Sequence, residues 1–298
     1  MTSQTIDAAA SGTWKLGDLP VHRIGFGAMR LPQHGEALEA DAVPRDRDQA
    51  IRVLRRAVEL GVNHIDTAAF YFSPLRSANE LINRALGPYP DDLVIATKVG
   101  PGRDASGQWQ AHATPAQLRG QVEENLRQLG RDHLDVVNLR IVGTDSIAER
   151  FGALAELREA GLIRHLGLSN IRPHHLAEAQ AIAPVACVQN MYGIGATPEQ
   201  KKLLEICGDQ GIAFVPFYSI AGTGRTAGAT TGHSPEVSAL ARAHGVSPAQ
   251  IRLAWTLHQG PHILTIPGTG DPDHLVQNIA TGSLHLSEED LSTLHRAA

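Results

Sequence analysis

The sequence has few cysteines and few aromatic residues. Its 298 residues include only 2 cysteines, 3 tryptophans, 4 tyrosines and 6 phenylalanines. Two cysteines without a CxxC motif exclude a disulfide-dense secreted scaffold, and we expect a reducing, cytoplasmic location. The sequence contains no run of about 18 apolar residues, so it predicts no membrane-spanning helix. Residues 1–12 lack the basic and apolar regions of a signal peptide, so we expect them to form a flexible lead.

Positive charge is also scarce. The chain has 26 Lys and Arg against 31 Asp and Glu, a formal net charge of -5. This balance disfavours the basic surface that nucleic-acid binding requires, so we expect neither a nucleic acid nor a membrane as partner. The length and the 42% of hydrophobic residues favour one large domain over residues 13–298. Histidine, with 15 residues, is abundant enough to test for metal or acid-base chemistry.

Short apolar runs typical of strands alternate eight times with longer segments whose apolar residues recur every three or four positions. Eight strand-helix repeats within about 250 residues are typical of a (β/α)8 TIM barrel, an α/β fold with parallel strands. The predicted strands are residues 24–29, 64–67, 93–98, 134–139, 163–168, 185–189, 213–217 and 263–267.

Further elements are expected outside the eight repeats. Residues 14–16 and 21–23 flank the turn signal Gly17-Asp18, which predicts an N-terminal β-hairpin at the barrel floor. Ser287 and the acidic residues after it predict a capped C-terminal helix. The Gly- and Thr-rich run 221–234 follows the seventh strand and is expected to be a mobile loop on the top face.

Three polar residues stand near strand ends, where barrels of this kind carry their reactive groups. Asp66 and Lys98 lie at the ends of the second and third predicted strands, and Tyr71 follows Asp66 in a loop. A tyrosine becomes a proton donor near neutral pH when a neighbouring ammonium lowers its pKa from about 10. Lys98, paired with Asp66, could supply that charge. Spacing alone equally favours a structural Asp66–Lys98 pair with Tyr71 as a loop aromatic.

Five motifs occur in the order and spacing of the aldo-keto reductases. They are GVNHIDTA followed by Tyr71, TK at Lys98, GLSN at Asn170, VQN at Gln189, and IPGT followed by Asn278. The sequence resembles this family from Leu19 to the last helix. The phrases PRDRDQAI, DVVNLR and LHLSEEDLSTL are most similar to its bacterial pyridoxal reductase branch.

The resemblance implies an oxidoreductase that binds NADPH without a Rossmann domain and reduces an aldehyde or ketone. It implies that Tyr71 is the proton donor, that Lys98 lowers the pKa of Tyr71, and that Asp66 holds Lys98. The resemblance implies that Met29 binds the cofactor, and that Ser169, Asn170, Gln189 and Phe217 contact its nicotinamide. Of these, Ser169, Asn170 and Gln189 are expected to bind the carboxamide. Phe217 stands where the family stacks a tyrosine on the ring, and a phenyl ring can also stack.

At the other end of the cofactor, the resemblance implies that Thr269 binds the adenosine phosphate and that Gln277 and Asn278 contact adenine. A helix N-terminus there favours an anion. Gly268 and His274 stand where many members of the family have Lys and Arg, so NADH stays an alternative cofactor. Arg225, in the Gly- and Thr-rich loop, is a candidate substitute, although an arginine in such a loop is more often solvated.

Arg140 is the larger departure, because the family usually has a histidine at this position. Arginine is permanently charged and cannot shuttle a proton. We expect it to orient the carbonyl or stabilise the developing alkoxide, and to favour a substrate with a negative group beside the carbonyl, such as the phenolate of pyridoxal. In the alternative interpretation, Arg140 turns away and pairs with an acidic neighbour.

The histidines do not form a credible metal site in the sequence. His174 and His175 are consecutive and do not share a helix face. His258 and His262 have the spacing of a metal-binding helix, but a Gly-Pro pair between them breaks such a helix. We therefore expect no metal. Trp109, in the loop after the third strand, is expected to line the substrate mouth, with simple packing as the alternative.

The sequence thus predicts NADPH-dependent reduction of a small carbonyl compound, with pyridoxal as the leading substrate, by a monomer or weak homo-oligomer. Three alternatives stay open. They are a carbonyl reductase of a specialised biosynthetic pathway, a cofactor-bound regulatory protein with little catalysis, and a metal-dependent barrel hydrolase. The presence of Asp66, Tyr71 and Lys98 disfavours the second, and the missing ligand pairs disfavour the third.

Overall fold

The centre of the molecule is a curved sheet of parallel strands. The computed structural model describes residues 6–35, 38–39, 41–104, 106–220 and 233–296. Seven strands follow one another across the sheet in the order β13-β12-β11-β10-β7-β4-β3. Their bounds are β3 (Phe26–Gly27), β4 (His64–Asp66), β7 (Val94–Val99), β10 (Leu134–Arg140), β11 (Ile163–Ser169), β12 (Val185–Gln189) and β13 (Ala213–Phe214).

The barrel closes through the eighth predicted strand. Ile263 forms a parallel bridge with Phe214 of β13, and Thr265 forms one with Ile24, two residues before β3. The backbone N–H of Leu264 donates to the carbonyl of Phe214 over 2.9 Å, so this segment is hydrogen-bonded to the sheet's last strand. The predicted (β/α)8 barrel is confirmed, with a first strand that is shorter than the predicted 24–29.

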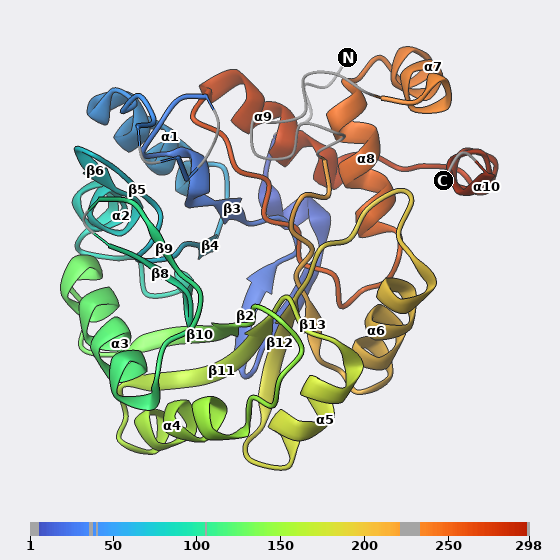
Figure 1. Ribbon diagram of the computed structural model, residues 1–298. Helices are drawn as coiled ribbons and strands as arrows, with labels where there is room; N and C mark the ends of the chain where they lie inside the picture. The colour runs from blue at the N-terminus through green and yellow to red at the C-terminus, as the bar shows by residue number, and fades with distance from the viewer. Residues whose placement is uncertain (1–5, 36–37, 40, 105, 221–232, 297–298) are drawn as a thin grey trace.

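Helices surround the sheet (Figure 1), because an amphipathic helix buries its apolar stripe against the core. In α1, for example, the buried residues are Ala50, Ile51, Val53, Leu54 and Ala57. The helices α7 and α10 pack against each other at the edge of the ring. The bounds are α1 (Arg47–Glu59), α2 (Ala78–Leu86), α3 (Pro115–Leu129), α4 (Ala148–Glu159), α5 (Pro173–Gln180), α6 (Pro198–Asp209), α7 (Pro235–His244), α8 (Pro248–Leu257), α9 (Pro272–Ala280) and α10 (Glu288–Arg296).

Short elements lie at both ends of the barrel. The top carries two small hairpins, β5 (Phe72–Ser73) with β6 (Arg76–Ser77), and β8 (Gly102–Arg103) with β9 (Trp109–Gln110). Three 3-10 turns complete the list: η1 (Ala8–Ser11), η2 (Ala28–Arg30) and η3 (Thr281–Ser283). No helix in the described part of the chain combines the length and apolar character needed to cross a membrane.

The predicted hairpin closes the barrel floor. It consists of β1 (Thr13–Leu16) and β2 (Leu19–His22), which pair antiparallel. Leu16 and Val21 are buried in one cluster with Val94, Val136 and Leu264, which point into the barrel interior from three strands. The floor is therefore a packed apolar plug, and the prediction for this hairpin is confirmed.

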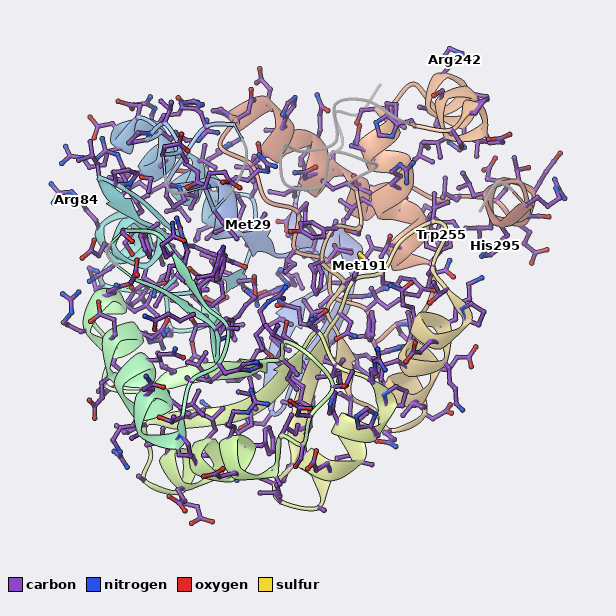
Figure 2. All side chains as sticks on the ribbon, in the orientation of Figure 1. Met29, Arg84, Met191, Arg242, Trp255 and His295 are labelled. Carbon is purple, nitrogen blue, oxygen red and sulfur yellow. The ribbon has the colours of Figure 1, made fainter. Side chains whose placement is uncertain are left out.

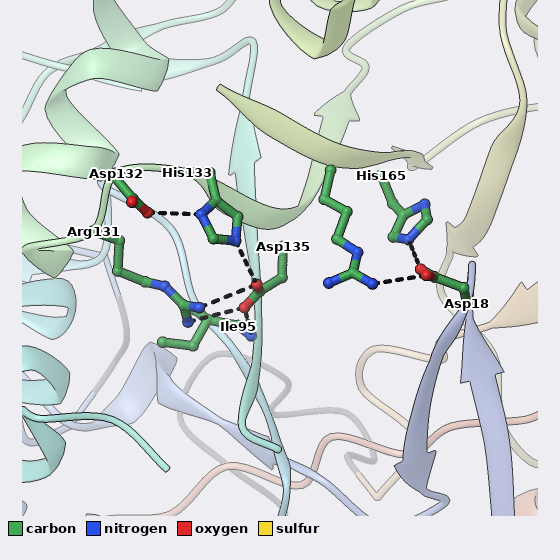
Figure 3. A network of polar contacts seen from close by, with 8 residues as sticks. Asp18, Ile95, Arg131, Asp132, His133, Asp135 and His165 are labelled. Atoms are coloured by element: carbon green, nitrogen blue, oxygen red, sulfur yellow. Dashed lines mark hydrogen bonds and ion pairs between the residues drawn. The ribbon is translucent and has the colours of Figure 1, made fainter. Parts of the chain in front are cut away.

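Two ion-pair groups fasten the amino-terminal ends of the strands (Figure 3). Asp18, in the hairpin turn, accepts hydrogen bonds from Arg164 at 2.7 Å and interacts with His165 Nε2 at 2.5 Å, which ties the floor to β11. Asp135 of β10 accepts the Ile95 backbone N–H at 2.8 Å and pairs with Arg131 at 2.9 Å. The carboxylates thus connect the hairpin and neighbouring strands at the closed end of the barrel.

The two ends of the domain differ in how well they were predicted. The C-terminal capping box is confirmed, since the Asp290 N–H donates to Ser287 Oγ and the Ser287 N–H donates to the Asp290 carboxylate. The expected flexible lead over residues 1–12 differs from the structure. Ala8 is fully buried and its N–H donates to the Leu60 carbonyl, so the described part from residue 6 packs on the domain. Both cysteines of the sequence are buried free thiols.

Candidate active site

A cavity of about 990 Å³ opens at the carboxyl ends of the strands. Its lining includes Asp66 from the end of β4, Lys98 from β7, Arg140 from the end of β10 and Gln189 from the end of β12. Met29, in the turn after β3, also lines it and is labelled in Figure 2. Parallel strands bring these residues together because their carboxyl ends meet at one edge of the barrel.

A buried ion pair forms the polar centre of the cavity. Lys98 Nζ donates to Asp66 Oδ1 at 2.5 Å and to the Thr67 carbonyl at 3.0 Å. The second oxygen of Asp66 accepts the side-chain amide of Gln189 at 2.7 Å. Burial is the strongest single influence and lowers the pKa of Lys98, but the charges and hydrogen bonds of Asp66 and Tyr71 together outweigh it and raise that pKa above its ordinary value. Lys98 is therefore a permanent cation at neutral pH.

Tyr71 lies against this ion pair. Its side chain is buried, and the Lys98 Nζ lies 4.9 Å from the centre of its ring. Burial raises the pKa of Tyr71 above its ordinary value of 10.0, and the opposing charges of Lys98 and Arg140 do not reverse this. The sequence predicted a lowered pKa, so this part of the expectation is wrong for the protein without bound ligand. Desolvation of the phenolate outweighs the field of the ammonium, and Tyr71 keeps its proton at neutral pH.

Arg140 points into the cavity. Its Nη1 donates to Ser169 Oγ at 3.1 Å, and its guanidinium carbon lies 5.2 Å from the centre of the Phe217 ring. Within the described residues it forms no ion pair with a carboxylate, which differs from the alternative in which Arg140 turns away to an acidic neighbour. Two of the cationic side chains that line the cavity, Lys98 and Arg140, are therefore close enough to the phenol of Tyr71 to act on its pKa.

The structure brings together some of the expected nicotinamide ligands and separates others. Gln189 and Phe217 line the cavity, and the buried Ser169 hydroxyl lies between Arg140 and Gln189, 3.4 Å from the Gln189 amide oxygen. Ser169 and Asn170 are both outside the cavity lining, and the side-chain amide of Asn170 donates to the Ile141 carbonyl at 2.9 Å. The role of Asn170 as a carboxamide ligand stays a prediction.

The other end of the cavity is formed by the loop before α9. Thr269, Gln277 and Asn278 line it, as expected. The Thr269 hydroxyl accepts the Asp271 N–H at 3.0 Å, next to the first turn of α9. Arg225, the candidate substitute for a missing cation, lies outside the described residues with most of the Gly- and Thr-rich loop.

Sequence reasoning missed two cations at this end, Arg30 and Arg45, which also line the cavity. Arg45 is the first arginine of the phrase PRDRDQAI, which served only as a sign of the family branch. The available signal was an arginine placed directly before a helix whose N-cap is Asp46. Nothing in the sequence connects it to the loop before α9.

Trp109 lies at the mouth, as expected. It is in β9, about half exposed at 50%, and lines the cavity. Its ring meets Phe70 edge to face with 5.6 Å between the centres, and Phe70 meets Tyr71 in the same way at 5.2 Å. These aromatics form an apolar wall that leads to the Tyr71 hydroxyl. Among the described residues, no three His, Cys, Asp or Glu side chains are grouped to hold a metal ion.

Comparison with known proteins identifies this arrangement. Residues 23–298 match the aldo/keto reductase family. The chain belongs to that family. This aldo/keto reductase is 44% identical to pyridoxine 4-dehydrogenase from Escherichia coli (strain K12), over 96% of this chain and 98% of the relative. It is 37% identical to an uncharacterized oxidoreductase from Schizosaccharomyces pombe, over 98% of this chain and 92% of the relative.

Solved structures agree with the fold. An aldo-keto reductase from Klebsiella pneumoniae in complex with NADPH superposes with a TM-score of 0.77 at 28% identity, over 93% of this chain and 91% of that one. A thermostable aldo-keto reductase in complex with the inhibitor epalrestat gives a TM-score of 0.79 at 27% identity, over 96% and 99%. The predictions of family, barrel fold and NAD(P)H-dependent oxidoreductase are confirmed.

Proposed function

We propose that this aldo/keto reductase reduces the aldehyde of pyridoxal to an alcohol with NADPH, and that Tyr71 donates the proton. The observation that carries the proposal is the buried Asp66–Lys98 pair against Tyr71, at the bottom of a cavity that also contains Arg140. The 44% identity to a pyridoxine 4-dehydrogenase supports the substrate class, because that name describes the reverse of the same conversion.

The cavity fits a nicotinamide dinucleotide. Its volume of about 990 Å³ is at the upper end for sites that bind small organic molecules. The Phe217 ring offers an aromatic group on which a planar ring can stack, and Gln189 lines the same cavity. Thr269 and Asn278 at the other end offer polar groups to an adenosine. We therefore assign nicotinamide contacts to Met29, Ser169, Gln189 and Phe217, and adenosine contacts to Thr269, Gln277 and Asn278.

When bound, the reduced nicotinamide supplies the hydride that adds to the carbonyl carbon. Tyr71 donates its hydroxyl proton to the carbonyl oxygen, which completes the alcohol, and it regains a proton from solvent afterwards. Lys98 stabilises the phenolate left on Tyr71, because its ammonium lies beside the ring. Asp66 keeps Lys98 charged and fixed in place. Gln189 completes the contacts of the Asp66 carboxylate.

Arg140 gives the site its substrate preference. It presents a charged fork to the cavity and forms no ion pair among the described residues. A guanidinium in this place stabilises negative charge that develops on the carbonyl oxygen, and it also attracts an anionic group next to the carbonyl. The phenolate of pyridoxal is such a group. Phe70 and Trp109 supply an apolar wall for the aromatic ring that carries it.

The experiment that tests the proposal follows NADPH oxidation at 340 nm on addition of pyridoxal. A matched pair of aromatic aldehydes, one with an ortho hydroxyl and one with the methyl ether in its place, tests the preference for an anionic neighbour. We expect NADPH oxidation with pyridoxal, and faster turnover of the hydroxy aldehyde than of its methyl ether. Binding of NADPH without turnover of any aldehyde would contradict the proposal and favour a regulatory protein.

A further inference from the structure

Arg45 places a cation at the end of the cavity that faces the loop before α9. Its backbone is fixed on both sides, since its N–H donates to the Pro32 carbonyl at 3.0 Å and its carbonyl accepts from Arg76 Nε at 2.8 Å. The side chain is half-buried. The position of the guanidinium is therefore set by the fold rather than by chance contacts of a surface side chain.

Within the described residues, this guanidinium donates to weak acceptors. Its three nitrogens donate to the carbonyls of Arg30, Gln33 and Gly270 at 3.2, 3.5 and 3.4 Å. These distances are at the long limit of hydrogen bonds, and the acceptors carry no charge. Arg45 forms no ion pair with a carboxylate within the described residues. A guanidinium has five N–H donors, so these three long bonds to neutral carbonyls do not use its full capacity for hydrogen bonding.

The loop before α9 is shaped to receive Arg45. A Cβ atom on Gly270 would lie 2.2 Å from both Nε and Cζ of Arg45, so the guanidinium occupies the space that any larger residue would fill. The Gly270 carbonyl also accepts from Gln49 Nε2 at 2.9 Å, which connects the start of α1 to this loop. Figure 1 shows α1 and α9 side by side at this edge of the barrel.

A second arginine lies close to Arg45 at this end of the cavity. Arg30 lines the same end of the cavity, and its pKa is lowered by burial and further by the charge of Arg45. The carboxylate of Asp271 raises the pKa of Arg45, against the stronger lowering by burial. The Asp271 carboxylate already accepts the N–H groups of Asp273 and His274 as the cap of α9. An additional anion at this end would reduce the repulsion between the two arginines.

We propose that Arg45 binds the 2′-phosphate of NADPH and thereby gives the enzyme its preference for NADPH over NADH. This inference rests on the proposed function. Many members of the family have Lys and Arg where this chain has Gly268 and His274. Arg45, in the segment before α1, would take the place of those cations. A phosphate accepts two short, charge-assisted hydrogen bonds from a guanidinium, in place of the long bonds to carbonyls.

The test is a comparison of dissociation constants, measured by isothermal titration calorimetry, for NADPH, NADH, adenosine 2′,5′-bisphosphate and adenosine 5′-monophosphate. The variants are Arg45→Gln, Arg45→Lys and, as a matched control, Arg52→Gln on the exposed face of α1. We expect Arg45→Gln to weaken NADPH about 10- to 100-fold, the effect of losing a hydrogen bond to a charged group, and NADH less than about 3-fold. Arg45→Lys should be intermediate, because a lysine is not bidentate.

Equal weakening of NADPH and NADH by Arg45→Gln, or no weakening of NADPH, would overturn the inference. So would a wild-type enzyme that binds adenosine 5′-monophosphate as tightly as the 2′,5′-bisphosphate. If Arg45→Gln lowers the melting temperature, Gly270→Ala gives a second test, since it displaces the guanidinium and should weaken NADPH selectively. Failure of the proposed function gives a different result: the wild type would bind NADPH but reduce no aldehyde.

Discussion

Replacement of Asp66 by asparagine should destabilise the fold, because it leaves the Lys98 ammonium without its counter-ion. Both side chains are almost fully buried, with 5% of Asp66 and 2% of Lys98 exposed. Removal of one partner of a buried ion pair costs about 3–5 kcal/mol in free energy of unfolding. At about 2–4 °C per kcal/mol, we expect a loss of roughly 10 °C in melting temperature at pH 7.

The deficit should depend on pH. In the wild type, Asp66 raises the pKa of Lys98 above its unfolded value of 10.5. The ion pair therefore contributes to stability below pH 10.5, and this contribution is lost as the pH rises through the higher pKa of the folded state. In Asp66→Asn, burial remains and lowers the pKa of Lys98 below its unfolded value. The unfolded chain then binds more protons than the folded one, so the stability of the variant rises with pH. We expect the difference from wild type to shrink between pH 7 and pH 10.

Urea unfolding followed by circular dichroism at several pH values measures both effects. The double variant Asp66→Asn/Lys98→Met is the control, because it removes the unpaired charge as well as its partner. It should be more stable than Asp66→Asn at pH 7. If the single variant is as stable as wild type, or if the double variant is less stable than the single one, the reasoning from an uncompensated buried charge is refuted.

Three further perturbations test other parts of the molecule. Burial raises the pKa of Tyr71 above 10.0, so kcat/KM for aldehyde reduction should stay constant up to pH 10 and fall only at higher pH. A fall in kcat/KM below pH 8 would contradict this. Arg140→His should lower kcat/KM for pyridoxal about 100-fold and for a neutral aldehyde much less, and an unchanged substrate profile would refute the role of Arg140. Asp135→Asn breaks a mostly buried ion pair with Arg131 and should lower the free energy of unfolding by about 2 kcal/mol, measured by urea titration. An unchanged urea midpoint would show that this pair does not stabilise the fold.

The architecture could be predicted from the sequence because the periodicity of apolar residues and the ends of strands are local patterns. Each predicted strand from the second to the sixth overlaps an observed one, from β4 (His64–Asp66) to β12 (Val185–Gln189). Since carboxyl ends of parallel strands meet at one edge, the meeting of Asp66, Lys98 and Arg140 followed from their positions in the repeats. The first and eighth strands were less well bounded, because each has few ladder bonds in the structure.

Other features depend on distant contacts and on burial. Arg45 and Gly270 are 225 positions apart, so no local pattern connects them. The direction of the Tyr71 pKa was wrong because spacing reveals its charged neighbours but not the extent to which its hydroxyl is desolvated. The hydrogen bond from the Asn170 amide to the Ile141 carbonyl of the neighbouring strand end is also a contact that no local pattern shows, and the cofactor role of Asn170 stays a prediction. In each case the fold places a partner that the sequence does not indicate.

The central claim is that Tyr71 donates the proton in carbonyl reduction. The most direct measurement is the single-turnover rate of pyridoxal reduction by Tyr71→Phe loaded with NADPH, together with its dissociation constant for NADPH. The phenyl ring keeps the contacts of Tyr71 with Phe70 and removes only the hydroxyl. We expect NADPH binding to stay within about 3-fold of wild type, since no binding contact is lost, and the rate to fall by about 10²–10⁴. A rate equal to that of wild type would contradict the claim.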